Sequence, residues 1–248
     1  MTLQDFFTLH PKSAVAFSGG VDSAYLLYAA RSWGADVRAY YVKSEFQPEF
    51  EYLDALRLAA ELDVDLKVLP LNILRVPYVA ENPSDRCYHC KKAIFSAILK
   101  AAEEDGYTIL LDGTNSSDDV NDRPGMRALK ELSVLSPLRE CGLTKEHIRQ
   151  LSREKGLFTW NKPAYACLAT RIPTGEKITE DKLSATENAE KYLFSLGFRD
   201  FRVRSTDGHA RLQIPEAQLG LLLEKRPLIL AELKAHYETV SLDLEVRE

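Results

Sequence analysis

The segment Ser18-Gly19-Gly20-Val21-Asp22-Ser23 directly follows a short apolar run and opens a helical pattern. A helix N-terminus presents backbone N–H groups and a partial positive charge, and glycines let the backbone approach an anion without a Cβ atom in the way. We therefore predict that this loop binds phosphate. Because it lacks the Lys-Ser/Thr ending of a Walker A motif and the glycine spacing of a Rossmann fingerprint, it indicates neither a γ-phosphate kinase nor a dehydrogenase.

A second polar segment, Asp112-Gly113-Thr114-Asn115, follows an apolar run at 108–111. Open α/β sheets bind ligands beyond the carboxyl ends of their strands, so Gly113 and Thr114 are expected in the same crevice as the first loop. Ser44 follows a second predicted strand, at 37–42, and is expected near the adenine or ribose of a nucleotide. Mg²⁺ takes few carboxylates and keeps several waters. The acidic candidates for holding it are Asp22, Asp118, Asp119 and Asp122. The alternative is that these are solvated loop carboxylates.

The four cysteines are too few and too unevenly placed for a disulfide scaffold, so metal binding or thiol chemistry must be considered. Cys167 lies in a predicted loop with Lys162 and Arg171 nearby in the sequence, and a nearby cation lowers the pKa of a thiol and favours the nucleophilic thiolate. The alternative is an inert loop or packing cysteine. Cys141 is interpreted as structural.

Cys87 and Cys90 form a Cys-x-x-Cys pair, which together with Cys167 could supply three ligands of a four-iron four-sulfur cluster. The spacing is a metal signal, but one pair without a second pair or a histidine pair does not complete a site. Two thiols at the start of a helix are the favoured interpretation, and the cluster is its rival.

In Phe201-Arg202-Val203-Arg204 the two-residue period of a strand puts the apolar side chains on one face and Arg202 and Arg204 on the other. Two guanidinium groups on one face suit a phosphate, although a solvated strand face is the simpler interpretation of the residues alone. Glu190 falls on the preceding predicted helix, where scattered glutamates usually form only a solvent-exposed face.

The strands and helices that position the phosphate loops are predicted from an alternation of apolar runs and helical patterns. Strands are predicted at 14–17, 37–42, 66–69 and 108–111, and helices at about 21–30, 50–62, 91–103 and 144–155. Such alternation predicts an α/β fold, a parallel sheet with helices on both faces.

Beyond residue 179 the pattern changes to that of a smaller C-terminal α+β domain. Helices are predicted at 180–196 and 219–236, strands at 201–204, 210–214 and 240–246, and a hairpin at Asp207-Gly208. The predicted domains are 1–163 for the nucleotide, 164–178 as a loop that carries Cys167, and 179–248 for substrate binding or oligomerisation.

The composition is that of a folded globular protein, since 45% of the 248 residues are hydrophobic and 28% are charged. No run approaches the roughly 20 apolar residues of a membrane helix, and the segment from Met1 to Phe17 lacks the features of a signal peptide. We therefore expect a cytoplasmic protein without membrane contact. The net charge of −5 argues against a broad nucleic-acid surface and against a tRNA substrate.

Several segments together resemble the LarE family of ATP-dependent sacrificial sulfur transferases, which act in nickel-pincer nucleotide cofactor biosynthesis. Besides the two loops, the matching segments are Asn82-Pro83-Ser84-Asp85-Arg86-Cys87-Tyr88-His89-Cys90-Lys91, Arg123-Pro124-Gly125, Ser136-Pro137-Leu138 and Cys167-Leu168-Ala169-Thr170-Arg171-Ile172-Pro173. The first loop resembles the pyrophosphate loop (PP-loop) of the ATP pyrophosphatases. The same loop occurs in tRNA thiolases and in the synthases of GMP, NAD, asparagine and argininosuccinate. It therefore identifies only the ATP chemistry. The segment at Cys167 selects the family.

The resemblance implies an adenine nucleotide alpha-hydrolase-like fold and a small-molecule nucleotide substrate. The enzyme would use ATP for adenylation of a carboxylate of pyridinium-3,5-biscarboxylic acid mononucleotide. Cys167 would then transfer its own sulfur to that carboxylate, which becomes a thiocarboxylate, and residue 167 would remain as dehydroalanine. The resemblance also implies a homo-hexamer. The implied site residues are Ser18, Gly19, Gly20, Asp22, Ser23, Ser44, Gly113 and Thr114 for ATP, Asp22 and Asp118 for Mg²⁺, and Arg202, Arg204 and Glu190 for the substrate phosphate.

Other functions stay open at this point. One is sulfur transfer that depends on an iron-sulfur cluster, or another adenylating reaction of a PP-loop enzyme. A different class is a non-catalytic adenine-nucleotide sensor, which would need the loop but no reactive thiol. Cys167 is the residue that separates the sensor from the enzyme.

Overall fold

The computed structural model describes residues 1–119 and 124–245, so Asp122 and Arg123 lie outside the described residues. The chain forms two compact units. The first comprises Met1–Val76 and Asp85–Tyr165, and the second comprises Pro77–Ser84 and Ala166–Glu248. The second unit therefore begins within the predicted cysteine-bearing loop, and it includes a segment that the sequence analysis had placed in the first domain.

Hydrogen bonds of Asn82 join this segment, Pro77–Ser84, to the rest of the second unit. The Asn82 side-chain nitrogen donates to the carbonyl oxygen of Pro173 at 2.7 Å, and its backbone carbonyl oxygen accepts the Gly175 N–H at 2.8 Å. The first of these bonds spans 91 residues of sequence. Local patterns carry no information about such a contact, which explains the difference in the boundary.

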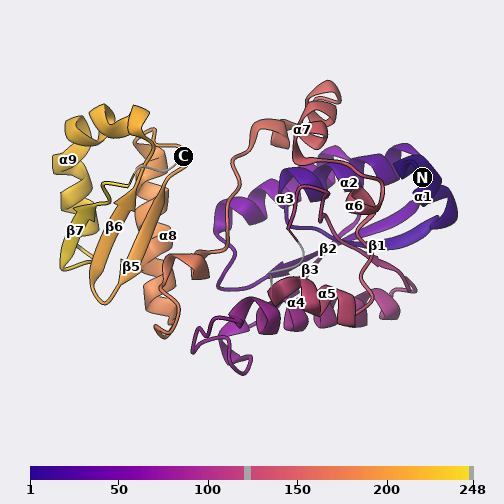
Figure 1. Ribbon diagram of the computed structural model, residues 1–248, viewed down its shortest axis with the longest axis horizontal. Coiled ribbons are helices and arrows are strands. Elements are labelled where there is room, and N and C mark those ends of the chain that lie inside the picture. The colour runs from indigo at the N-terminus through magenta and orange to yellow at the C-terminus, as the bar shows by residue number, and fades with distance from the viewer. Residues whose placement is uncertain (120–123, 246–248) are drawn as a thin grey trace. The chain divides into compact units, whose positions relative to one another are not determined.

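The first unit is an α/β fold whose described strands form one parallel sheet (Figure 1). The α/β prediction is therefore confirmed. Its elements are α1 (Leu3–Leu9), β1 (Lys12–Ala16), α2 (Val21–Ser32), β2 (Asp36–Lys43), α3 (Glu49–Glu61), β3 (Leu66–Pro70), α4 (Arg86–Glu104), β4 (Leu110–Leu111), α5 (Pro124–Glu131), α6 (Pro137–Glu140) and α7 (Lys145–Glu154).

Side chains of the central strands alternate between two apolar layers. Val15 of β1 and Tyr41 of β2 pack in the layer that contains α2 and α3. Their neighbours Ala14 and Tyr40 pack in the layer that contains Ile98 of α4. Because successive strand residues point to opposite faces, helices cover both faces of the sheet. Figure 1 shows α2 and α3 on one side and α4 and α5 on the other.

The strand order β3-β2-β1-β4 determines where a ligand can bind. The chain moves from β1 outward through β2 and β3, and then crosses to the other side of β1 to form β4. Such a reversal opens a crevice at the carboxyl ends of the strands that it separates, here β1 and β4. The two predicted phosphate loops follow these two strands.

The second unit is a small α+β fold, and its elements are α8 (Glu180–Ser195), β5 (Arg202–Thr206), β6 (His209–Gln213), α9 (Leu219–Leu233) and β7 (Thr239–Leu242). β5 and β6 are antiparallel, and β7 runs parallel to β6. Apolar residues of α8 and α9 pack with those of the strands in one core. The hairpin prediction is confirmed, since Thr206 pairs with His209 around Asp207 and Gly208, whose φ angles are +32° and +75°.

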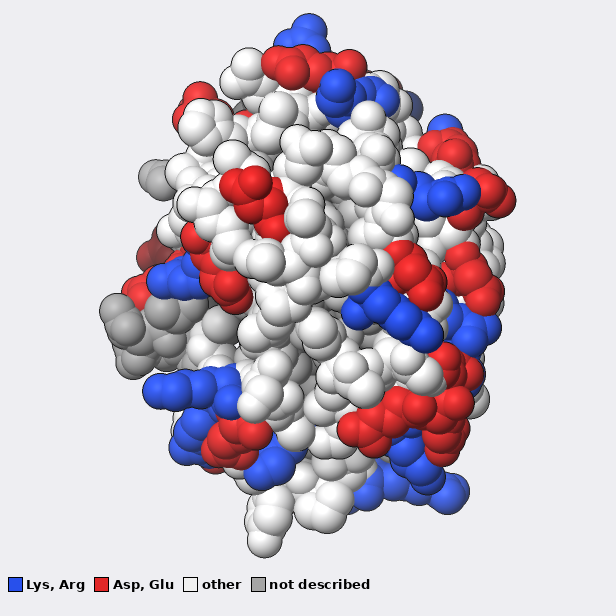
Figure 2. All heavy atoms as spheres, turned by 90° about the vertical axis from the view of Figure 1, so that its right-hand side faces the viewer, with Lys and Arg blue, Asp and Glu red and all other residues white. Residues whose placement is uncertain are grey.

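The surface carries charges of both signs. On the face drawn in Figure 2, acidic and basic side chains lie next to one another around a broad uncharged area. Exposed ion pairs such as Arg31–Asp63, 3.0 Å apart, are examples of this mixing. Within the two described ranges, no helix combines the length and the apolar character that a membrane crossing requires.

Candidate functional site

The first loop is a short connection from β1 to α2 whose shape depends on glycine and serine. Gly20 is the N-cap of α2, and Gly19 has a φ angle of +74°, which other residues rarely adopt. The Ser23 hydroxyl lies 3.1 Å from the Ser18 hydroxyl and accepts the Ser18 backbone N–H at 3.3 Å. The loop is therefore held in shape by its own side chains, and it ends at a helix N-terminus, where backbone N–H groups bind anions.

A pocket of about 240 Å³ lies beside this loop. The loop contributes one wall, and α3, α7 and the segment after α7 contribute the others. Its lining residues are Ser18, Gly20, Val21, Asp22, Glu51, Lys145, Lys162, Pro163, Ala164 and Tyr165. The fold thus brings residues from distant parts of the sequence to the predicted phosphate loop.

Two lysines that the sequence analysis did not assign to the phosphate loop reach this pocket. Lys145 Nζ lies 2.5 Å from a carboxylate oxygen of Asp22, and Lys162 Nζ lies 2.7 Å from Asp54 and 3.3 Å from the Gly19 carbonyl oxygen. Lys145 is the first residue of α7, where the helix dipole disfavours a cation. The sequence alone could therefore have marked Lys145 as a candidate site residue, because a lysine at the start of a predicted helix is unfavourably placed. Both ammonium groups suit a polyphosphate chain in the pocket.

The loop after β4 packs against the N-terminus of α2. A Cβ atom on Gly113 would lie 2.9 Å from the Ser23 backbone nitrogen, so glycine is what permits this approach. Asp112 is buried, and its carboxylate accepts hydrogen bonds from the hydroxyls of Thr114 at 2.5 Å and Ser136 at 2.6 Å. The structure therefore brings the two predicted loops together, with the Thr114 side chain engaged in fixing its own loop.

Of the acidic Mg²⁺ candidates, Asp22 lines the pocket, and it accepts a hydrogen bond from Asn115 Nδ2 at 3.2 Å. The Asp118 carboxylate instead accepts the Asn115 backbone N–H at 3.0 Å, and Asp119 is exposed. Neither is among the lining residues. Across 1–119 and 124–245, no group of three or more His, Cys, Asp or Glu side chains is arranged to hold a metal ion.

Ser44 belongs to a tight turn at the end of β2. Its hydroxyl donates to Gln47 Oε1 at 2.6 Å and accepts the Phe46 N–H at 3.3 Å. The side chain is buried, and it is not among the lining residues of the pocket. Its hydroxyl therefore shapes the turn that was predicted to lie near the adenine or ribose.

Three of the four thiols belong to the first unit. Cys87 is exposed and Cys90 is half-buried in the first turns of α4, and the buried Arg86 donates to Cys87 Sγ at 3.6 Å. Cys141 packs against the core, and burial raises the pKa of its thiol. A raised pKa reduces the thiolate fraction, which agrees with a structural role for Cys141.

Cys167 is half-buried and precedes a short 3-10 turn, Leu168–Arg171, of the second unit. The two cations near it in the sequence are both bound to carboxylates. Arg171 lies 2.8 Å from Glu190, and Lys162 pairs with a carboxylate of the first unit. The effect of either cation on the pKa of the Cys167 thiol stays a prediction.

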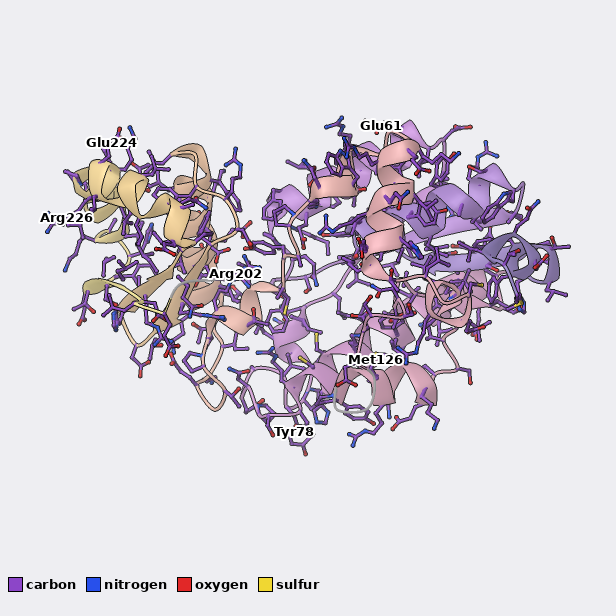
Figure 3. All side chains as sticks on the ribbon, turned by 45° about the horizontal axis from the view of Figure 1, so that its top comes forward. Glu61, Tyr78, Met126, Arg202, Glu224 and Arg226 are labelled. Carbon is purple, nitrogen blue, oxygen red and sulfur yellow. The ribbon has the colours of Figure 1, made fainter. Side chains whose placement is uncertain are left out.

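The arginine pair of β5 is not a solvated strand face. Arg202, labelled in Figure 3, is 5% exposed and donates to a neighbouring backbone carbonyl oxygen at 2.6 Å. Arg204 is half-buried and donates to the Thr170 carbonyl oxygen at 2.5 Å. Glu190 is 2% exposed, so the expectation of a solvent-exposed helix face is wrong at this residue. All three side chains lie in the same unit as Cys167.

No protein-family model matches the sequence. The chain is 36% identical over 233 residues to pyridinium-3,5-bisthiocarboxylic acid mononucleotide synthase of Lactiplantibacillus plantarum, with 93% of this chain and 84% of that protein covered. It is also 36% identical over 251 residues to an uncharacterized protein of Synechocystis sp., covering 98% and 92% of the two chains. A tRNA-specific 2-thiouridylase of Clostridium botulinum is 28% identical over 181 residues, which cover 60% of this chain and 51% of that protein.

Proposed function

This chain belongs to the LarE family of ATP-dependent sulfurtransferases, and we propose that it converts a carboxylate of pyridinium-3,5-biscarboxylic acid mononucleotide to a thiocarboxylate in nickel-pincer nucleotide cofactor biosynthesis. The proposed sulfur donor is Cys167. The similarity to a synthase named for the corresponding bisthiocarboxylic acid supports the substrate, and the pocket beside α2 supports the use of ATP.

In the proposed first step, an oxygen of the substrate carboxylate attacks the α-phosphorus of ATP, and pyrophosphate leaves. The N-terminus of α2 binds the leaving group, and Lys145 and Lys162 exchange their carboxylate partners for its phosphate oxygens. The product is an acyl adenylate. This step is needed because a free carboxylate resists attack by a thiolate, whereas an acyl adenylate has a good leaving group.

Mg²⁺ is expected to accompany ATP, and Asp22 is the residue that fits it best. Mg²⁺ prefers carboxylate oxygens and water, and the Asp22 carboxylate lines the pocket. The Asp118 carboxylate, which accepts a backbone N–H, is the weaker candidate. When bound, the ion would neutralise part of the charge on the phosphates.

In the proposed second step, the Cys167 thiolate attacks the acyl carbon, AMP leaves, and a thioester forms. A base then removes the Cys167 α-proton, the electron pair forms a Cα–Cβ double bond, and the Cβ–S bond breaks. The sulfur remains on the substrate as a thiocarboxylate, and residue 167 becomes dehydroalanine. Arg202 and Arg204 are proposed to hold the substrate phosphate, because their guanidinium groups match phosphate oxygens.

The observation that carries the proposal is the pocket between the first loop and α7. It joins a helix N-terminus, which binds anions, to two ammonium groups that carboxylates hold in place. This combination suits a pyrophosphate leaving group. A nucleotide sensor would need the pocket alone, whereas the proposed enzyme also needs the Cys167 thiol.

The test is an intact-mass measurement before and after a single turnover with ATP, Mg²⁺ and the substrate. We expect AMP and pyrophosphate as products, loss of one hydrogen sulfide from the polypeptide, and dehydroalanine at residue 167. The amount of thiocarboxylate should not exceed the amount of enzyme. ADP and orthophosphate as the stoichiometric products would contradict the adenylation step.

Cysteine variants separate this proposal from a cluster mechanism. Cys167→Ser should still release pyrophosphate but deliver no sulfur, while the matched control Cys141→Ser should transfer sulfur normally. Cys87→Ser and Cys90→Ser should retain most of the activity. Repeated turnover with sulfide, iron in the protein, an intact Cys167 and a requirement for Cys87 and Cys90 would instead establish the cluster mechanism.

A further inference from the structure

Cys167 and the 3-10 turn Leu168–Arg171 that follows it form one segment, here called the Cys167 turn. Buried polar contacts tie this segment to the rest of the second unit. Arg171, at the end of this turn, has a side chain that is 0% exposed. Its Nη1 donates to the Ala166 carbonyl oxygen at 2.9 Å and to the Thr170 hydroxyl at 2.8 Å. The Thr170 hydroxyl in turn donates to the Cys167 carbonyl oxygen at 2.8 Å. One guanidinium group therefore braces the backbone on both sides of Cys167.

The other edge of the same guanidinium group meets Glu190 of α8. Arg171 Nε and Nη2 donate to the two Glu190 carboxylate oxygens at 2.8 Å and 3.2 Å. The Glu190 carboxylate also accepts the Val203 backbone N–H of β5 at 3.0 Å. Both carboxylate oxygens are thus engaged, and a single side chain connects the turn, the helix and the strand.

β5 carries the arginine pair proposed for the substrate phosphate. Val203 lies between Arg202 and Arg204, and Arg204 Nη1 donates to the Thr170 carbonyl oxygen at 2.5 Å. The turn and β5 are therefore joined twice, through Glu190 and through Arg204. Any shift of the turn relative to β5 breaks one of these connections.

A buried ion pair is a poor way to gain stability, because hydrophobic residues of similar volume often serve equally well or better. Its value lies in geometry, since the planar fork of arginine fixes the direction of its hydrogen bonds. We infer that Arg171 and Glu190 are positioning residues that hold the Cys167 thiol at a fixed place relative to the β5 arginine pair. This inference rests on the proposed role of Cys167, and it makes Glu190 an anchor rather than a ligand of the substrate phosphate.

The decisive variant replaces both partners, Arg171→Met with Glu190→Leu, and so leaves no charge without its partner. We expect this protein to fold and to release pyrophosphate at the normal rate with an unchanged KM for ATP. Its single-turnover rate of sulfur transfer should fall about tenfold to a hundredfold, because misplacing a reacting group by about 1 Å has an effect of that size. Alkylation of Cys167 by iodoacetamide, followed by peptide mass spectrometry, should change by several-fold.

Two further variants guard against misfolding and against a general effect. Glu190→Gln keeps the shape, and its amide oxygen can still accept the Val203 and Arg171 Nε–H groups, but it leaves the Arg171 charge without a carboxylate. Circular dichroism of both variants selects those that fold, and folded Glu190→Gln should show a smaller loss of transfer in the same direction. Lys182→Met breaks a different ion pair of the second unit, that between Lys182 and Glu176, and should leave both transfer and alkylation unchanged.

Normal transfer and normal Cys167 alkylation in folded Glu190→Gln and in the folded double variant would overturn the inference. An equal loss in Lys182→Met would also overturn it, since the effect would then be general. Failure of the proposed function has a different signature, which is sulfur delivery by Cys167→Ser. The alkylation rate can be measured without any turnover, so the two failures are distinguishable.

Discussion

The two units hold their charged groups in different ways. In the first unit, Lys145 and Asp22 form an ion pair whose side chains are 34% and 21% exposed. In the second unit, Arg171 and Glu190 form a pair whose side chains are 0% and 2% exposed. A pair that water reaches can exchange a partner for a ligand at little cost, whereas breaking a buried pair leaves a charge in a medium of low dielectric constant. The first pair therefore suits a ligand that comes and goes, and the second suits a fixed part of the chain.

The largest expected effect tests this contrast directly. Arg171→Met leaves the Glu190 carboxylate buried without its partner, and we expect the free energy of unfolding to fall by about 3 to 5 kcal/mol. Lys145→Met, at the more exposed pair, should change it by about 1 kcal/mol or less. Denaturant titrations of both variants, followed by circular dichroism, measure the difference. Equal losses in the two variants would show that burial does not distinguish the pairs.

Replacing the β5 arginines should separate binding from positioning within the second unit. If the pair holds the substrate phosphate as proposed, Arg202→Ala and Arg204→Ala should each weaken binding of the phosphorylated substrate by about 1.5 to 3 kcal/mol, the range for a hydrogen bond to a charged group. Arg204→Ala should also slow sulfur transfer, since Arg204 donates to the Thr170 carbonyl oxygen of the Cys167 turn. Calorimetry with the substrate and single-turnover kinetics measure the two effects. Normal substrate affinity in both variants would remove the pair from the substrate site.

Local signals in the sequence predicted much of the fold. The helices predicted to begin near residues 144 and 180 do begin there, because Thr144 and Thr179 are N-caps whose side chains accept the backbone N–H groups of His147 and Lys182. These signals work because a cap or a two-residue hairpin involves neighbours in sequence. The same logic would have found α1, which begins with a capping box at Thr2. The predicted start of α4 at residue 91 was wrong, since the helix begins at Arg86, and its N-cap Asp85 makes no side-chain cap hydrogen bond.

The partners of the charged residues could not be predicted in this way. The contact between Lys145 and Asp22 spans 123 residues, and that between Arg171 and Glu190 spans 19. Such pairs form only when the tertiary structure brings two elements together, and a strand or helix pattern does not state which face is covered. For this reason Glu190 looked like a solvated residue, and the pocket lysines were not assigned to the phosphate site.

Two glycines of the first unit should respond differently to alanine. A Cβ atom on Gly113 would lie 2.9 Å from the Ser23 backbone nitrogen, so Gly113→Ala should lower stability by about 1 to 3 kcal/mol and weaken ATP binding. A Cβ atom on Gly20 would lie 3.5 Å from the Ser18 hydroxyl, an ordinary contact, so Gly20→Ala should lower stability by about 1 kcal/mol or less, through the poorer capping of α2 by alanine. If phosphate approaches Gly20, ATP binding should nevertheless weaken. Thermal melts and ATP titrations distinguish these outcomes, and normal ATP affinity in Gly20→Ala would place the phosphates elsewhere.

The smallest expected effect concerns an ion cluster of the first unit that water reaches. Hydrogen bonds from Lys67 hold the pKa of the Asp105 carboxyl below its ordinary value of 3.8. A carboxyl whose pKa is lower in the folded state stabilises the fold above its unfolded-state pKa, and the contribution disappears as the pH falls through the folded-state value. Asp105→Asn should therefore be less stable than the parent protein at pH 7, and the difference should shrink as the pH falls below the ordinary carboxyl value of 3.8. Asp63→Asn, whose carboxylate is 93% exposed, is the matched control and should change the free energy of unfolding at pH 7 by less than Asp105→Asn. Because salt screens charges that water reaches, 1 M NaCl should shrink the Asp105 gap at pH 7 but leave the effect of Arg171→Met almost unchanged. A gap that is independent of both pH and salt would mean that Asp105 acts through packing and not through its charge.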